Sequence, residues 1–196
     1  DTKFRTVKFI KFKSGALENT RELLKVELQA EGLKCEELHG DGAPELISKD
    51  TVELLAAENC KCSYSPPYTP QLNGVAERAN RTIWESAFAM WLESCLPAML
   101  WVFAVLYAVV CANFLPTTTD FGWMSPYEAK YDVVPNTGSP SEPLFRIFGC
   151  IAYVHIPAEV RDSTLADKAY KGYFVGLKWP LLDRFLVYVP SLDRVV

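Results

Sequence analysis

Two acidic residues, Asp41 and Glu77, are of a type that could serve phosphoryl-transfer chemistry if the fold brings them together. Residues 42 to 76 lie between them, a separation of 35 positions. Asp41 stands in the turn sequence HGDGAPE, and Glu77 follows an Asn-Gly loop in the sequence VAERANR. Carboxylates hold Mg²⁺, and paired cations activate a nucleophile and stabilise a leaving oxygen. In the alternative interpretation Asp41 is an ordinary turn residue, and Glu77 forms an ion pair with Arg81 on a solvated surface.

The segment between the two acids has the pattern needed to bring them together. It predicts a helix over residues 45–60, a strand over residues 61–65 and a loop that ends at Gly74. A further helix is predicted over residues 75–93. This order can return the chain to the same edge of a sheet, with Glu77 in the first turns of the next helix. Four residues then share one helical face by their spacing: Glu77, Asn80, Arg81 and Trp84.

The flanking sequence predicts a mixed region followed by a small all-β module. Residues 4–13 alternate apolar residues with Arg and Lys, which indicates a strand, either a sheet edge protected by lysines or a basic strip for a polyanion. A helix over residues 14–34 and a short strand over residues 34–41 follow. Residues 133–143 are rich in Pro, Gly and Ser and indicate a linker. Beyond them come short strand-like segments, with a hairpin around residues 190–193.

The longest uncharged stretch, residues 94–119, has the length of a membrane span. Pro97 and Pro116 bracket it, Asn113 lies inside it, and no cluster of Lys or Arg flanks it. We therefore predict that residues 98–114 form a helix packed on the protein core, and that the chain has no membrane partner.

The composition limits the remaining possibilities. The net charge is −4 and the isoelectric point is about 5.3, so nucleic-acid binding by bulk charge is disfavoured and would require local basic patches or metal ions. The six cysteines form no regular framework and are interpreted as reduced thiols of an intracellular protein. The two histidines, His39 and His155, are too isolated for a His/Cys zinc site.

Several motifs resemble the integrase of copia-type retrotransposon Pol polyproteins. They are GDGAPELISKD around Asp41, YSPPYTPQLNGVAERANRT around Glu77, LPAMLWVFAVLYAVVCANFLP, SPYEAKYDVVP and LFRIFGCIAYVHIP. The resemblance covers nearly the whole chain. It implies an α/β fold with a ribonuclease-H-like integrase core over residues 1–132 that lacks its first strands, a linker over 133–143, and a partial SH3-like β module over 144–196.

The resemblance also implies a function and a set of site residues. Family members use an Asp, Asp, Glu triad with Mg²⁺ or Mn²⁺ to join element DNA ends to target DNA. Asp41 corresponds to the second acid and Glu77 to the third, both as metal ligands. The implied partners are DNA and further copies of the parent integrase, and the implied location is the nucleus. The implied nucleic-acid-binding residues are Asn73, Gly74, Arg78, Asn80 and Arg81.

Two departures from the family pattern lead us to expect an inactive chain, so enzyme status stays open. Pro44 stiffens a turn where the family is permissive. The segment that begins at Asp1 matches the end of the second strand and the third strand, so the first catalytic Asp is expected upstream of this chain. The alternative is a non-enzymatic nucleic-acid-binding or assembly remnant of a transposable element.

Overall fold

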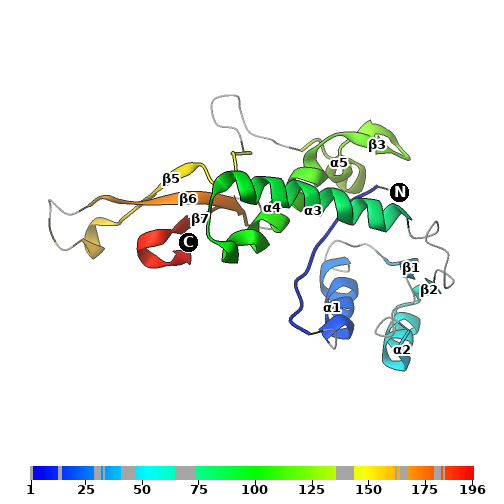
Figure 1. Ribbon diagram of the computed structural model, residues 1–196. Coiled ribbons are helices and arrows are strands. Elements are labelled where there is room, and N and C mark those ends of the chain that lie inside the picture. Colours follow the sequence, from blue (N-terminus) through cyan, green and yellow to red (C-terminus); the bar gives the residue numbers. More distant parts are fainter. Residues whose placement is uncertain are drawn as a thin grey trace. The chain divides into compact units, whose positions relative to one another are not determined.

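The structure is a computed structural model of the 196 residues. It describes the chain except for residues 1, 13–14, 29–31, 33, 41–46, 65–73, 136–143, 162, 164–166, 179–181 and 183. The chain divides into two compact units, one of Lys8–Asn80 and one of Asp1–Val7 with Arg81–Val196 (Figure 1). Helices and strands mix along the chain, which confirms the predicted mixed α/β class.

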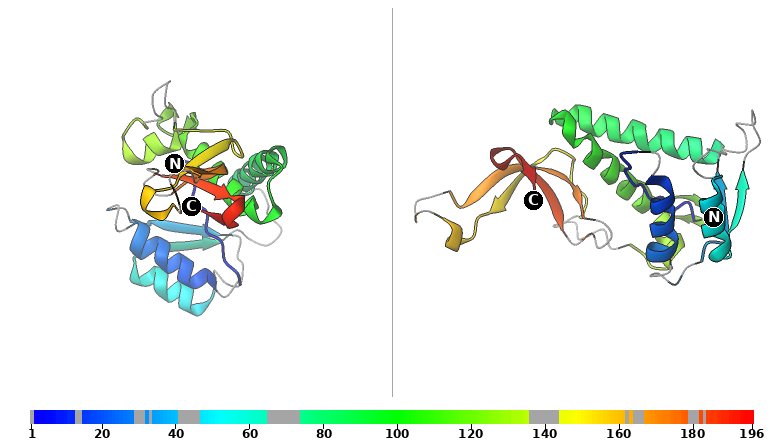
Figure 2. Two further views of the ribbon diagram at one scale, coloured as in Figure 1. Left: turned by 90° about the vertical axis from the view of Figure 1, so that its left-hand side faces the viewer. Right: turned by 90° about the horizontal axis from the view of Figure 1, so that it is seen from below.

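The unit Lys8–Asn80 contains a parallel pair of strands joined through a helix. Helix α1 (Ala16–Glu22) continues as the π-helical turn η2 (Leu23–Leu28). Strand β1 (Glu37–Gly40), helix α2 (Lys49–Ala57) and strand β2 (Lys61–Tyr64) follow. The strands pair in parallel, with Glu37 opposite Lys61 and Gly40 opposite Tyr64. Helices α1 and α2 lie side by side on one face of this pair (Figure 2).

The core of this unit is small and depends on the amphipathic pattern of α2. The buried apolar residues of this core are Leu24, Leu54, Leu55 and Cys60. Ser48 begins α2, because its hydroxyl accepts a hydrogen bond from the Thr51 N–H at 3.3 Å. The predicted helix over 45–60 is therefore confirmed in its central part, and the predicted strand over 61–65 is confirmed as β2.

Two long helices follow, as predicted. Helix α3 (Gly74–Ser94) begins in the first unit and ends in the second. The turn η4 (Ala98–Leu100) leads into α4 (Trp101–Phe114), which ends where Leu115 adopts an extended conformation before Pro116. In the part of the chain that the structure describes, no helix has both the length and the apolar character to cross a membrane.

The second unit also holds two small sheets. Strands β3 (Thr117–Thr119) and β4 (Gly122–Met124) form a hairpin, followed by α5 (Pro126–Tyr131). Strands β5 (Ile151–His155), β6 (Ala169–Leu177), β7 (Phe185–Val189) and β8 (Arg194–Val195) form an antiparallel sheet in that order, with η5 (Ala158–Val160) between β5 and β6. The turn η6 (Pro190–Leu192) joins β7 to β8, which confirms the predicted hairpin.

The core of this unit lies between α4 and the four-stranded sheet. Tyr107 of α4 contacts Phe174 of β6 edge-on, with ring centroids 5.2 Å apart. Leu100, Ala104 and Val175 are fully buried beside them. The mostly apolar sequence of α4 is thus explained by burial within the protein, as a helix covered on most sides requires.

One close approach fixes the start of this sheet. Gly149 has φ +82°, and a Cβ atom added there would lie 2.5 Å from the Cβ of Ser94 at the end of α3. Only glycine combines this backbone conformation with this spacing. The segment before β5 is therefore pressed against the end of α3.

The predicted strand over residues 4–13 is wrong for the residues that the structure describes there. Thr2–Ile10 form no regular secondary structure. The backbone of Arg5 instead forms two hydrogen bonds with the Asn113 side chain. Its N–H donates to Asn113 Oδ1 at 2.9 Å, and its C=O accepts from Asn113 Nδ2 at 2.7 Å. An alternating pattern becomes a strand only beside another strand, and here a buried amide of α4 satisfies the backbone in place of one.

Candidate functional site

The parallel pairing of β1 and β2 determines where the two predicted acids leave the sheet. In a parallel pair both carboxyl ends lie at the same edge. Gly40 is the last residue of β1 and directly precedes Asp41 in the sequence, and Tyr64 opposite it is the last residue of β2. The segments that run toward Asp41 and toward α3 therefore start at one edge. Asp41 itself lies outside the described residues.

Glu77 lies in the first turn of α3 and is exposed. The ion pair with Arg81 that the alternative interpretation required is not formed between these two described residues. Glu77 lies near the start of the helix because Gly74 favours the end of the preceding loop, whereas the residues from Val75 onward favour a helix. An exposed carboxylate near a helix start is available as an oxygen ligand for a hard cation such as Mg²⁺ or Mn²⁺.

The other predicted residues fall on the same helix where they are described. Gly74 is the first residue of α3, and Arg78, Asn80 and Arg81 are exposed on it. Asn73 lies outside the described residues. Further along, Trp84 is 53% exposed and stacks on Trp101, with ring centroids 5.6 Å apart. The helix thus presents two guanidinium groups and an amide near Glu77, a combination suited to phosphate oxygens.

Within the described ranges, no three His, Cys, Asp or Glu side chains gather closely enough to hold a metal ion. The carboxylate oxygens of Glu77 fit a divalent cation. Of the predicted metal-binding pair of Asp41 and Glu77, Glu77 is the member that the structure describes.

Sequence reasoning missed a polar group beside the end of β1. His39 Nδ1 lies 2.8 Å from Ser63 Oγ across the strand pair, and Ser63 donates a hydrogen bond to Glu37. The cross-strand register alone produces this arrangement, since Ser63 is opposite His39. His39, interpreted from the sequence as isolated, therefore belongs to a hydrogen-bonded group two residues before Asp41.

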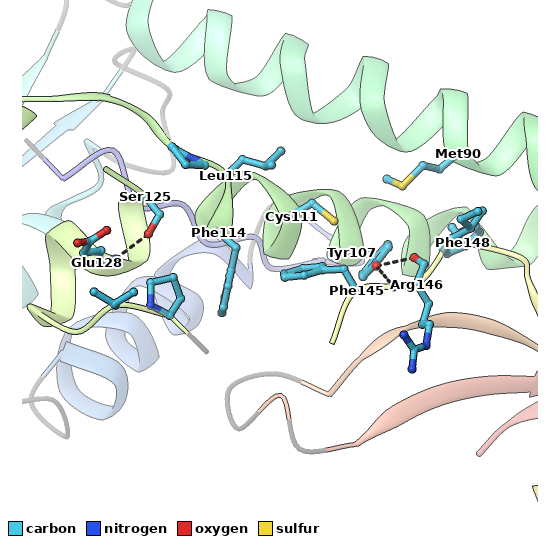
Figure 3. A pocket seen from close by; sticks show the side chains of 14 residues that line it. Met90, Tyr107, Cys111, Phe114, Leu115, Ser125, Glu128, Phe145, Arg146 and Phe148 are labelled. Atoms are coloured by element: carbon cyan, nitrogen blue, oxygen red, sulfur yellow. Dashed lines mark hydrogen bonds between the residues drawn. The ribbon is translucent and has the colours of Figure 1, made fainter. Parts of the chain in front are cut away.

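A second feature that the sequence did not indicate is an apolar cavity of about 700 Å³ in the unit that contains α4 (Figure 3). The Tyr107 hydroxyl donates to the C=O of Arg146 at 2.7 Å and accepts from its N–H at 3.1 Å. Burial is the main reason that the pKa of Tyr107 is raised. Glu128 and Arg146 are the charged members of the lining, so its chemistry differs from that of the acid-bearing edge.

The homologues of the chain are retrovirus-related Pol polyproteins of plant transposons. It is 33% identical over 145 residues, 74% of its length, to the retrovirus-related Pol polyprotein from transposon TNT 1-94 of Nicotiana tabacum. It is 31% identical over 112 residues, 57% of its length, to the polyprotein from transposon RE1 of Arabidopsis thaliana, and 28% identical over 127 residues, 65% of its length, to that from RE2. The chain spans 7–10% of the length of these relatives. No family model matches it.

One solved structure of an integrase assembly is similar in fold, and a second, of an integrase domain, matches less well. A chain in the structure of the simian T-cell lymphotropic virus intasome in complex with PP2A regulatory subunit B56 gamma matches 97% of this chain, with a TM-score of 0.50 and 14% identity, over 63% of its own length. The catalytic core domain of BIV integrase matches 62% of this chain and 73% of its own length, with a TM-score of 0.44 and 22% identity. The first likeness concerns the fold alone.

These comparisons confirm the predicted relationship to retrotransposon Pol polyproteins. The integrase resemblance inferred from the motifs agrees with them. The copia type, the SH3-like module and the division at residues 132 and 143 stay predictions. The roles of Asp41 and Glu77 likewise stay predictions.

Proposed function

We propose that this chain is part of an integrase-type polynucleotidyl transferase with a ribonuclease-H-like core. The observation that carries the proposal is the shared carboxyl edge of β1 and β2, with Asp41 directly after β1 and Glu77 exposed in the first turn of α3. Homology to transposon Pol polyproteins supports it. The reaction would be metal-dependent strand transfer during DNA integration, in the nucleus, by an oligomer of the parent integrase.

The proposed roles follow from the chemistry of the side chains. Asp41 and Glu77 would hold Mg²⁺ or Mn²⁺ through carboxylate oxygens. Bound divalent cations supply activation of the attacking hydroxyl and stabilisation of the leaving oxygen. Arg78 and Arg81, one turn apart on the exposed side of α3, would contact DNA phosphates and set the position of the DNA end. Asn80 and the loop residue Asn73 would add neutral hydrogen bonds.

The test is cation binding by the purified chain, measured as Mn²⁺ affinity by electron paramagnetic resonance. We expect Glu77→Gln and Asp41→Asn each to weaken binding by about tenfold or more, because each removes a charged ligand. The double variant is expected to be little weaker than either single variant, since both ligands serve one site. Glu85→Gln, an exposed acid on the same helix, is the matched control and should leave the affinity unchanged.

Unchanged Mn²⁺ affinity in Glu77→Gln would contradict the proposal. Strand transfer is measured in parallel with Mn²⁺ and a pre-processed DNA end. Any activity of the chain should be lost in Glu77→Gln and kept in Glu85→Gln.

A DNA-contact role for the β5–β8 sheet is a second candidate function, and it corresponds to the predicted SH3-like module. Tyr153 of β5 is 71% exposed and lies opposite Lys171 of β6, which is also exposed. An aromatic ring beside an ammonium group suits stacking on bases and contact with phosphate. The other Lys and Arg residues of this region are Arg146, Arg161, Lys168, Lys178, Arg184 and Arg194.

Lys171→Gln tests this role by fluorescence anisotropy with a short DNA duplex at several salt concentrations. Loss of one phosphate contact should lower the slope of log K against log salt by about one. Lys49→Gln, an exposed lysine of α2, is the control. An unchanged slope in Lys171→Gln would exclude the contact.

A further inference from the structure

Three of the six cysteines gather where β1 and β2 begin. Cys35 lies two residues before β1, Cys60 directly precedes β2, and Cys62 lies within β2. The Sγ atoms of Cys35 and Cys60 are 2.7 Å apart. A disulfide bond is about 2.04 Å long, so a small approach of the two sulfur atoms would bring them to bonding distance.

The backbone holds these two cysteines in place. The N–H of Lys61 donates to the C=O of Glu36 at 2.9 Å, and the N–H of Cys60 donates to the C=O of Leu55 at 2.9 Å. Cys60 is 5% exposed and belongs to the small core with Leu55, whereas Cys35 is half-buried. Cys35 is therefore the more accessible of the two cysteines, and Cys60 is buried beside it.

We infer that Cys35 and Cys60 are a disulfide-forming pair that is oxidised by a low-molecular-weight disulfide such as glutathione disulfide. Cys35 loses its proton, and its thiolate attacks the reagent, forming a mixed disulfide and releasing one glutathione thiolate. The deprotonated Cys60 then attacks the Cys35 sulfur and releases the second glutathione. The two cysteines together lose two electrons and two protons, and glutathione disulfide becomes two molecules of glutathione.

The surroundings determine the order of the two steps and the choice of partner. Burial, followed by the hydrogen bond with Cys35, raises the pKa of Cys60 to about 12, so this thiol is a poor first nucleophile. Cys62 has a different partner, because its Sγ lies 2.7 Å from the Tyr64 hydroxyl. Cys35 therefore reacts first and Cys60 resolves the mixed disulfide.

The bond would close a ring of residues 35–60, which contains β1 and α2 and joins the starts of the two parallel strands. The starts of the two strands would then stay linked even when the hydrogen bonds between the strands break. This inference does not depend on the proposed function, since it concerns only the thiols and the strands that carry them.

The test uses the whole reduced chain, incubated in glutathione buffers of increasing oxidised fraction. Free thiols are blocked by alkylation, and peptides are analysed without reduction by mass spectrometry. We expect alkylated cysteines to fall from six to four, with a Cys35–Cys60 linked peptide. Cys62→Ser is the matched control and should keep this link. Cys35→Ser, at the half-buried position, should lose it while circular dichroism reports an intact fold.

Hydrogen–deuterium exchange supplies a second measurement. Amides of β1 and β2 should exchange more slowly in the oxidised wild-type chain, and oxidant should have no such effect on Cys35→Ser. Six alkylated cysteines at every buffer composition would overturn the inference. A Cys60–Cys62 link formed in place of the Cys35–Cys60 link would also overturn it.

Discussion

Asn113→Ala is expected to weaken the attachment of residues 2–7 to the rest of the unit that contains α4. Asn113 is 1% exposed and makes two hydrogen bonds to the backbone of Arg5, at 2.9 and 2.7 Å. Each such bond stabilises the folded state by about 0.5–1.5 kcal/mol net. The better helix propensity of Ala returns roughly 0.5 kcal/mol. Together these figures give a fall of about 0.5–2.5 kcal/mol in the free energy of unfolding, and we take about 1–2 kcal/mol as its central part.

Two measurements check this magnitude. For a chain of this length, thermal unfolding should shift by about 2–8 °C, since 1 kcal/mol corresponds to about 2–4 °C. Limited trypsin digestion reports the segment directly, because Arg5 is itself a cleavage site. If the loss of about 1–2 kcal/mol is local, cleavage after Arg5 should accelerate by roughly 5- to 30-fold under conditions where local opening limits the rate.

The control is Asn80→Ala, the same chemical change at an exposed position of α3. It should alter stability by no more than about 0.5 kcal/mol and leave cleavage after Arg5 unchanged. Unchanged cleavage in Asn113→Ala, together with an unchanged thermal midpoint, would refute the view that the Asn113 amide stabilises this segment.

Three further outcomes are expected. Gly172→Ala should destabilise the sheet by about 1–3 kcal/mol in urea unfolding, because the new Cβ would lie 2.5 Å from Val187 Cγ1, whereas Gly74→Ala, with open space around it, should not. Ser48→Ala should cost about 1 kcal/mol through loss of the α2 cap, measured in the same way. The raised pKa of Cys60 favours the neutral thiol in the fold, so its contribution to stability is complete below about pH 9 and is lost as the pH rises toward 12. Urea midpoints should accordingly fall more steeply across this range in the wild type than in Cys60→Ala, and parallel slopes would contradict this.

The local sequence pattern was sufficient to predict the helices and the last hairpin. The apolar run of α4 and its end before Pro116 follow from burial and from proline geometry, and the exposed position of Glu77 follows from the loop before it. Residues 4–13 were misread because alternation describes a strand only when a neighbouring strand exists. The approach of Cys35 to Cys60 and the group around His39 depend on pairing between distant segments, which no local window contains.

The contact between Gly149 and Ser94 also bears on the history of the gene. Every single-base change in the first two positions of a glycine codon removes glycine, and each replacement side chain would meet an atom at 2.5 Å in a backbone conformation that favours glycine. Relatives whose product must still fold in this way should therefore keep this codon through long divergence. Genes that drift without selection should lose it as readily as any other codon, so a replacement at position 149 marks a product that no longer needs this contact.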